Sequence, residues 1–439
     1  MDFSAGLCYD DRERGADAVE PSIKRGQRLY IIQAALEYLV SIMVTGSFLA
    51  TLTKELGFSD SLTGILSSII SLGCVFQLLT MSLRPRRSKP LVIALSVANQ
   101  LLFTLLYVVP LSGAGKPLKV ALAVVLILAA YVTYYLVHPR KTGWLMSLVE
   151  DGRRGLFTAN KEIVSLLAGM GFSFLMGTVS DHFAAAGELR TAFAITALVL
   201  TGLTVLHTLC MLFTPERETE VPATDSLVQH VRQVLTNKNL MRVTLLLLLY
   251  QMGNYACIPF YGSYLIGELG LSLQTVSLLV MLSSVARILV SKAWGRYADA
   301  RSFAAAFEKC LLVLLGAYLC ALLAVPANGF VMFLLYYLLY GIAMGGINSA
   351  LTNMVFDYVP PDRRADSLAV CQAATGVAGF LTTLCVSPLV TLIQENGNRL
   401  LGIPLYAQQA VTGLGLVFTV MAIVYVRCAL INKIKETSI

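Results

Sequence analysis

Charged residues are scarce in this chain. Only 13% of its 439 residues are Asp, Glu, Lys or Arg, whereas 56% are hydrophobic, and the mean hydropathy is +0.72. A soluble fold of this size would lack the polar surface needed to cover it. The composition therefore excludes a soluble globular protein. We interpret the net charge of +7 as a signal of membrane topology and expect no binding to nucleic acid.

The residue groupings that serve metals, cofactors and enzymes are also missing. The nine cysteines include no Cys-x-x-Cys pair, His182, His207 and His230 are isolated along the chain, and no Gly-rich phosphate loop occurs. We therefore expect no metal site, no cofactor, no enzymatic activity and no use of ATP. The first 25 residues lack the layout of a cleavable signal peptide and are predicted to belong to a cytoplasmic tail.

Long apolar stretches fill most of the chain. Each has about twenty residues or more, which is the length that an α-helix needs to cross a bilayer. The sequence predicts an all-α integral membrane protein with twelve transmembrane helices. The predicted spans are 29–51, 61–82, 90–111, 118–148, 156–179, 190–213, 241–265, 271–292, 303–325, 329–358, 366–393 and 404–427.

The loops between these spans are alternately rich and poor in Lys and Arg. Positively charged loops tend to stay in the cytoplasm, so we expect both termini to be cytoplasmic and the protein to lie in the cytoplasmic membrane of a cell, in contact with lipid. The opposite side then carries only five basic residues, namely Lys54, Lys116, Lys119, Arg190 and Arg399.

Two segments of the chain repeat. Trp144–Gly155 reads WLMSLVEDGRRG, and 210 residues later Met354–Ala365 reads MVFDYVPPDRRA; likewise KELGFS at Lys54–Ser59 returns as GELGLS at Gly267–Ser272. Such an internal repeat predicts two six-helix halves. The expected parts are a tail at 1–28, a first bundle at 29–213, a cytoplasmic linker at 214–240, a second bundle at 241–427 and a tail at 428–439.

Six plus six spans with a long central linker resemble the major facilitator superfamily of secondary transporters. The loop Gly295–Arg301, GRYADAR, is similar to that superfamily's loop signature, in which a Gly is followed four residues later by Asp and then by basic residues. The resemblance implies a monomer that moves a small-molecule substrate by alternating access. It also implies gating contacts, and the residues expected to make them are Arg153, Arg154, Gly295, Asp299, Arg301, Arg363 and Arg364.

Several charged residues fall at membrane depth, where an ionised side chain is costly unless it faces a cavity or a partner. Glu37 lies near the middle of the first span, on one stripe with Gln33, and Arg140 and Lys141 lie at similar depth in the fourth. Two roles stay open for Glu37: it binds substrate or a coupling proton, or it only pairs with Arg140 or Lys141. The further candidates are His138, beside a Pro139 expected to break its helix, and Lys161, Glu162 and Arg287.

The second half adds polar groups that share one helical face. Gln251, Asn254 and Tyr255 follow an i, i+3, i+4 spacing, and Asn348 lies in the tenth span. Because the deep cations outnumber the carboxylates, we expect a mildly positive cavity and an organic anion as substrate, with transport coupled to an ion gradient, H⁺ being the candidate ion. The alternatives are a sugar or polyol transporter, a drug efflux pump of the same fold, and a membrane sensor or scaffold that transports nothing.

Overall fold

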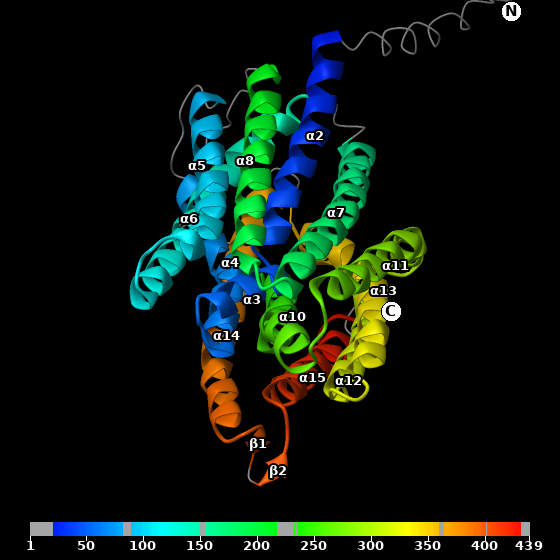
Figure 1. Ribbon diagram of the computed structural model, residues 1–439. Helices are drawn as coiled ribbons and strands as arrows, with labels where there is room; N and C mark the ends of the chain where they lie inside the picture. Colours follow the sequence, from blue (N-terminus) through cyan, green and yellow to red (C-terminus); the bar gives the residue numbers. More distant parts are fainter. Residues whose placement is uncertain are drawn as a thin grey trace, which may run out of the picture.

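The computed structural model of the chain describes residues 21–81, 89–149, 154–216, 232, 235–359, 364–400 and 402–431. Almost all of these residues are helical (Figure 1). Two short strands, β1 (Arg399–Leu400) and β2 (Ile403–Pro404), pair antiparallel in the hairpin before the last helix. The expectation of an all-α membrane protein is confirmed.

Among the described residues, seven α-helices precede the predicted linker. They are α2 (Pro21–Met43), α3 (Gly46–Glu55), α4 (Asp60–Met81), α5 (Lys89–Val108), α6 (Lys116–Met146), α7 (Arg154–Ala185) and α8 (Leu189–Phe213). The first predicted span corresponds to α2 and α3 together, which are bent by 44° at their junction. The bend frees the carbonyl of Met43, and the buried hydroxyl of Tyr107 donates a hydrogen bond to it at 2.6 Å.

Six further α-helices follow the linker. They are α10 (Lys238–Ser263), α11 (Leu273–Ala300), α12 (Phe303–Leu322), α13 (Gly329–Phe356), α14 (Arg364–Glu395) and α15 (Ala407–Val426), with π-helical turns η3 (Tyr264–Glu268) and η5 (Arg427–Ile431). In the described part of the chain, ten helices are long and apolar enough to cross a membrane. Counting the bent pair α2 and α3 as one span and adding α4, the arrangement is consistent with the twelve predicted spans.

One local expectation was wrong. Pro139 was expected to break the fourth span, but α6 runs unbroken from Lys116 to Met146. A proline removes one backbone donor and crowds one carbonyl, and the long apolar helix on both sides of it continues regardless.

The sequence repeat also appears in the backbone. Gly57 and Gly270 occupy the same position of the repeated hexapeptide, and both have left-handed φ values, +77° and +63°. A residue with a Cβ is strained in this conformation. Each glycine therefore allows the sharp turn that ends the first helix of its half.

Buried hydrophobic side chains form separate clusters before and after the linker. The largest cluster runs from Leu240 to Leu430, whereas a second one lies between Val40 and Leu200 and takes in only Leu273 from beyond the linker. Elsewhere leucines such as Leu198 and Leu289 are about three-quarters exposed, 74% and 75%. Such exposed leucines are typical of a surface that faces lipid.

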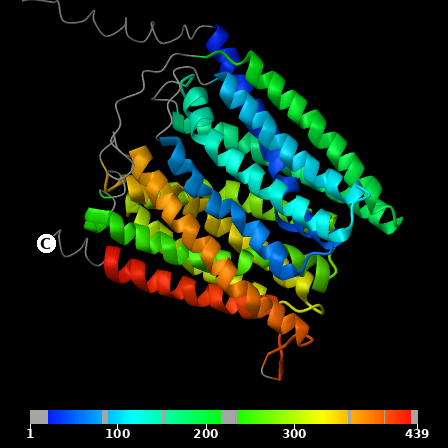
Figure 2. The ribbon, with the colours of Figure 1, turned by 90° about the vertical axis from the view of Figure 1, so that its left-hand side faces the viewer.

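The helices of the two groups converge toward one end of the molecule. Figure 2 shows them drawing together on the right, near the hairpin that follows α14, and lying further apart on the left, where η5 ends. We call the convergent end, where α3 leads into α4, the distal end. We call the opposite end, where α2 begins and which the charge pattern assigns to the cytoplasm, the basic end.

Candidate functional site

A central cavity of about 420 Å³ lies between the two groups of helices. It is lined by α4 and α6 from one group and by α10, α13 and α14 from the other. Its volume falls within the range of small-molecule sites in proteins. The polar and aromatic residues of its lining are Ser71, Tyr134, Tyr135, His138, Gln251, Tyr255, Thr352, Gln372 and Thr375.

Helix α6 supplies an aromatic wall to this cavity. The rings of Tyr134 and His138 lie one turn apart with their centroids at 5.0 Å, and Tyr135 donates a hydrogen bond from its hydroxyl to the carbonyl of Ile70 at 2.6 Å. The Nδ1 atom of His138 is buried and has no hydrogen-bond partner in the described part of the chain. This wall therefore presents flat aromatic faces to the cavity and contains one buried, unsatisfied imidazole nitrogen.

Helix α10 supplies the side-chain amide of Gln251, which is hydrogen-bonded to a second amide, that of Asn254. Asn254 donates through Nδ2 to Oε1 of the cavity residue Gln251 at 3.4 Å, and the buried Tyr318 donates through its hydroxyl to Oδ1 of Asn254 at 2.5 Å. These hydrogen bonds use one of the two acceptor sites of Gln251 Oε1 and leave its NH₂ group as a donor available to a solute. The predicted face of Gln251, Asn254 and Tyr255 thus contributes two lining residues and one supporting residue.

The deep charges of the first helices are paired within their own group. The ammonium group of Lys141 on α6 bonds to the carboxylate of Glu37 on α2, and Lys141 is 3% exposed. One turn before Glu37, the buried Gln33 hydrogen-bonds through Oε1 to Nε2 of His207 at 2.9 Å. Of the two partners considered for Glu37, Lys141 is the one that it contacts.

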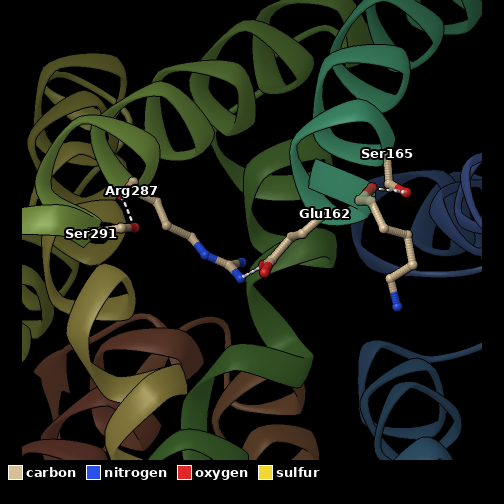
Figure 3. Close-up of polar contacts among 5 residues, drawn as sticks. Glu162, Ser165, Arg287 and Ser291 are labelled. Atoms are coloured by element: carbon tan, nitrogen blue, oxygen red, sulfur yellow. Dashed lines mark hydrogen bonds and ion pairs between the residues drawn. The ribbon is translucent and has the colours of Figure 1, made fainter. Parts of the chain in front are cut away.

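A second ion pair joins the two groups of helices. Arg287 on α11 reaches across to Glu162 on α7, as Figure 3 shows, and the two side chains are 26% and 48% exposed. Lys161, the neighbour of Glu162, instead lies over the ring of Tyr30, with its Nζ 5.6 Å from the centroid. Glu162 and Arg287 were expected separately as shallow membrane charges, and the fold brings them together.

The expected positive lining of the cavity is not found. No Lys or Arg is among the described residues that line it. Lys141 and Arg287 instead contact carboxylates. Arg140 and Asn348 are half-buried on α6 and α13 and also lie outside the lining. The cavity surface is instead composed of uncharged polar and aromatic groups.

The gating residues expected at the basic end are only partly described. Arg153 and Arg363 lie outside the described residues, as do the side chains of Arg154 and Arg364, which begin α7 and α14. Asp299 and Arg301 are exposed where α11 ends. A Cβ on Gly295 would meet nothing within 4 Å, so this glycine makes no close helix contact in the structure.

The close helix contacts occur elsewhere. A Cβ on Gly341 would lie 2.2 Å from the carbonyl oxygen of Ser283, and one on Gly345 would lie 2.7 Å from Val290. These two glycines let α13 pack directly on α11, which confirms the packing role that their small-xxx-small spacing indicates.

At the distal end, a carboxylate of one group holds the helix start of the other. Asp181 on α7 accepts hydrogen bonds from the backbone N–H groups of Leu273 at 3.0 Å and Gln274 at 2.7 Å, the first residues of α11. One turn earlier, a Cβ on Gly177 would lie 3.0 Å from the nitrogen of Gln274. A carboxylate at a helix N-terminus satisfies orphan donors and complements the helix dipole, so Asp181 stabilises the closed distal end.

Comparison with known proteins decides the family. The sequence model of the Major Facilitator Superfamily matches residues 30–383. The chain belongs to the major facilitator superfamily. Membership makes it a multi-pass membrane transporter. No curated protein sequence matches this member of the superfamily.

Solved transporters of known structure share the fold of this superfamily member. A variant of the nucleoside transporter NupG has a TM-score of 0.72 at 12% identity, covering 92% of this chain and 100% of its own. A bacterial homologue of the human lysosomal transporter Spinster, inward-facing and unoccupied, has 0.68 at 13%, covering 93% and 96%. A D-xylose-proton symporter has 0.61 at 12%, covering 91% and 97%. At such identities the similarity shows the fold alone.

Several residues around the cavity of this transporter were missed from the sequence. Gln372, Thr375 and Gly376 line it from α14, and their i, i+3, i+4 spacing is a signal that could have been used. Tyr134 and Tyr135 carried no such signal, because adjacent tyrosines in an apolar helix are equally typical of ordinary packing.

The pairing of Glu37 with Lys141 predicts a coupled loss of stability. Glu37→Gln and Lys141→Met should each lower the melting temperature in detergent, because each leaves a buried charge uncompensated. Since Glu37 keeps 21% exposure, we expect a cost at the lower end of the about 3–5 kcal/mol typical of broken buried pairs. The double variant should lose less than the sum of the two.

A thermal-melting double-mutant cycle measures this coupling. The pair of Glu308 with the half-exposed Arg427 provides the control, since its arginine is 54% exposed and its coupling should be smaller. Strictly additive losses at Glu37 and Lys141 would contradict the pairing.

The contact of Asp181 with α11 predicts a shift toward distal opening when it is removed. Asp181→Ala should increase the open population by about tenfold, because a hydrogen bond to a charged group contributes about 1.5–3 kcal/mol. Asp181→Asn keeps one acceptor oxygen and should increase the open population less than Asp181→Ala does. Spin-label distances between the exposed positions Ala186 and Ala327 report the opening.

Glu188→Ala is the matched control for Asp181→Ala, since it removes an exposed carboxylate in the same loop region. An equal distance distribution for Asp181→Ala and Glu188→Ala would show that Asp181 does not hold the distal end closed.

Proposed function

We propose that this protein is a secondary transporter of a small, neutral, polar solute of the sugar, polyol or nucleoside type. The proposal rests on the lining of the central cavity, which combines aromatic faces with amide and hydroxyl groups. No Lys or Arg is among the described residues that form this lining. Aromatic rings pack against the flat faces of such solutes, while amides and hydroxyls bind their hydroxyl groups. The nucleoside transporter and the D-xylose symporter of the same fold transport solutes of this type.

Two groups of residues would hold the solute from opposite sides. Tyr134 and His138 on α6 offer aromatic faces for stacking. Gln251 on α10 offers its NH₂ donors, and Gln372 on α14 offers a second amide. A solute bound by both groups would link the halves at 29–213 and 241–427, which we propose rock about it as two bodies in alternating access.

The organic anion favoured by the sequence is the weaker candidate. It requires cations that face the cavity, and the partners of Lys141 and Arg287 are carboxylates. A drug pump, or a protein that transports nothing, would show a different pattern of ligand stabilisation. We also propose that the protein works as a monomer in the cytoplasmic membrane with both termini in the cytoplasm, as the distribution of Lys and Arg indicates.

A thermal-stability screen of the purified protein tests the solute class. D-xylose, glucose, sorbitol, uridine and adenosine are compared with carboxylates, sugar phosphates and lipophilic cations. A ligand of the folded state raises the melting temperature with increasing concentration. We expect a neutral compound to stabilise the parent protein, and Gln251→Ala to weaken its binding at least about tenfold through the lost hydrogen bonds.

Gln408→Ala is the matched control, because Gln408 is a buried glutamine of α15 outside the cavity lining. Stabilisation by carboxylates or sugar phosphates alone would overturn the neutral-solute proposal in favour of the organic anion. Stabilisation by lipophilic cations alone would favour a drug pump.

We further propose that an ion gradient drives transport and that Glu37 carries the coupling proton. Glu37 is a carboxylate at membrane depth, and its partner Lys141 lies on α6, three residues after the cavity residue His138. Binding of solute at α6 and protonation of Glu37 would then act on the same helix.

Glu37→Gln should therefore abolish the dependence of uptake on a pH gradient in proteoliposomes, while exchange of solute down its own gradient continues. Glu162→Gln, which neutralises the carboxylate of the other pair, serves as the control. Uptake by Glu37→Gln with an unchanged pH dependence and gradient requirement would exclude Glu37 as the coupling residue.

A further inference from the structure

A second pocket lies between the halves at the distal end. Its volume is about 270 Å³, and it is lined from the first half by Lys54, Asp60 and Thr63 and from the second by Ser263 and Gln394, among others. It is bridged by a hydrogen bond from Nε2 of Gln394 to Oδ2 of Asp60 at 2.8 Å. Like the central cavity, this distal pocket draws polar groups from both halves.

The distal pocket and the central cavity follow one another along α4. Asp60 and Thr63 line the distal pocket, whereas Ile70, Ser71 and Cys74 line the central cavity. Ile70 lies seven positions after Thr63 on this helix, which is about 10 Å along the axis. The two spaces therefore lie in series across the interface between the halves.

An aromatic residue of α10 lies between Tyr255, which lines the central cavity, and Ser263, which lines the distal pocket. The ring of Phe260 on α10 is fully buried and rests directly on Gly64 of α4, where a Cβ would lie 2.2 Å from its Cε1 atom. Only glycine leaves room for the ring in this position. Beside it, a Cβ on Gly262 would lie 2.8 Å from the carbonyl oxygen of Gly46, so the backbones of α3 and α10 also touch.

The segment that carries Phe260 is irregular on both sides. Pro259 precedes it inside α10, and the π-helical turn Tyr264–Glu268 follows four residues later. Prolines and π-turns weaken or redirect the hydrogen bonds of a helix, and they mark the places where helices bend. The ring is thus attached to the part of α10 that can most easily change shape.

We propose that Phe260, whose ring packs against Gly64, is the barrier that closes the transport path at the distal end. The distal pocket is then the outer vestibule of that path. This proposal rests on the central cavity being the solute site. The vestibule receives a polar solute of the same class, because Asp60, Ser263 and Lys54 offer it a carboxylate, a hydroxyl and an ammonium group. Passage of the solute then requires the ring of Phe260 to move away from Gly64.

Thiol accessibility tests the barrier without any knowledge of the solute. Cys74 lines the central cavity and serves as the reporter in a full-length protein whose other cysteines are replaced by serine. A membrane-impermeant cationic methanethiosulfonate is applied separately to right-side-out and inside-out vesicles. In the parent, Cys74 should react faster from the basic end, whereas Ser263→Cys, in the vestibule, should react faster from the distal end.

Two substitutions then act on the barrier in different ways. Phe260→Ala should raise the rate of Cys74 labelling from the distal end at least tenfold and leave the rate from the basic end unchanged, because it opens a hole in the closed state. Gly64→Ala should raise the distal rate and lower the basic rate together, because its Cβ prevents the closed seating and shifts the population toward distal opening.

Matched controls keep the outcome interpretable. Phe333→Ala removes an equally buried ring inside the second half, and Gly202→Ala adds a Cβ where nothing lies within 4 Å; neither should change the ratio of the two rates. Melting temperatures identify variants that fail to fold. Distal labelling of Cys74 that is the same in folded Phe260→Ala as in Phe333→Ala overturns the barrier, and a Ser263→Cys that reacts no faster from the distal end overturns the vestibule.

The labelling experiment and the ligand screen fail independently. A protein that shows the predicted labelling but binds no neutral solute retains its barrier and loses only the proposed solute class. A protein that binds a neutral solute but labels equally in all variants retains its solute class and loses the barrier.

Discussion

The structure depends on the cost of placing charge inside a membrane. An unpaired cation at the centre of a bilayer costs about 2.5–3.5 kcal/mol on insertion scales, and the chain offsets this cost by pairing Lys141 with Glu37 and Arg287 with Glu162. Both pairs neutralise cationic side chains that could otherwise have bound a solute in the cavity. What remains along its described lining is amide, hydroxyl, imidazole and aromatic surface. Charge pairing therefore determines the chemistry of the proposed solute site.

The two pairs respond differently to a rocking motion. The first joins α2 to α6 within one group of helices, so it can persist while the halves move as bodies. The second joins α7 to α11 across the interface, as does the contact of Asp181 with the start of α11. In the alternating access proposed above, contacts at the distal end such as that of Asp181 have to break when this end opens. Each contributes only a few kcal/mol, so one conformation is favoured without becoming permanent.

The sequence predicted the helices well, because apolar length, charge asymmetry and the internal repeat can be seen in the sequence without knowing which residues meet in the fold. It also placed Glu37 and Lys141 at similar depth. It could not choose between Arg140 and Lys141, because successive residues of a helix point about 100° apart and the rotation of α6 is set by packing. Phe260 and Gly64 gave no signal at all, since their meeting depends on how closely α4 and α10 approach.

Glycine explains how the distal end can be tight and still open. Gly64, Gly177 and Gly262 at this end, and Gly376 beside the central cavity, each receive a backbone or a ring of the opposite half at a distance that a Cβ would obstruct. A glycine contact excludes water but has no side chain to interlock, so separating the halves requires little rearrangement of rotamers. Phe260 is a bulky group of this interface, and it is carried by the irregular part of α10. Closure therefore arises from many contacts without interlocking side chains. The proposed rocking of two halves requires such an arrangement.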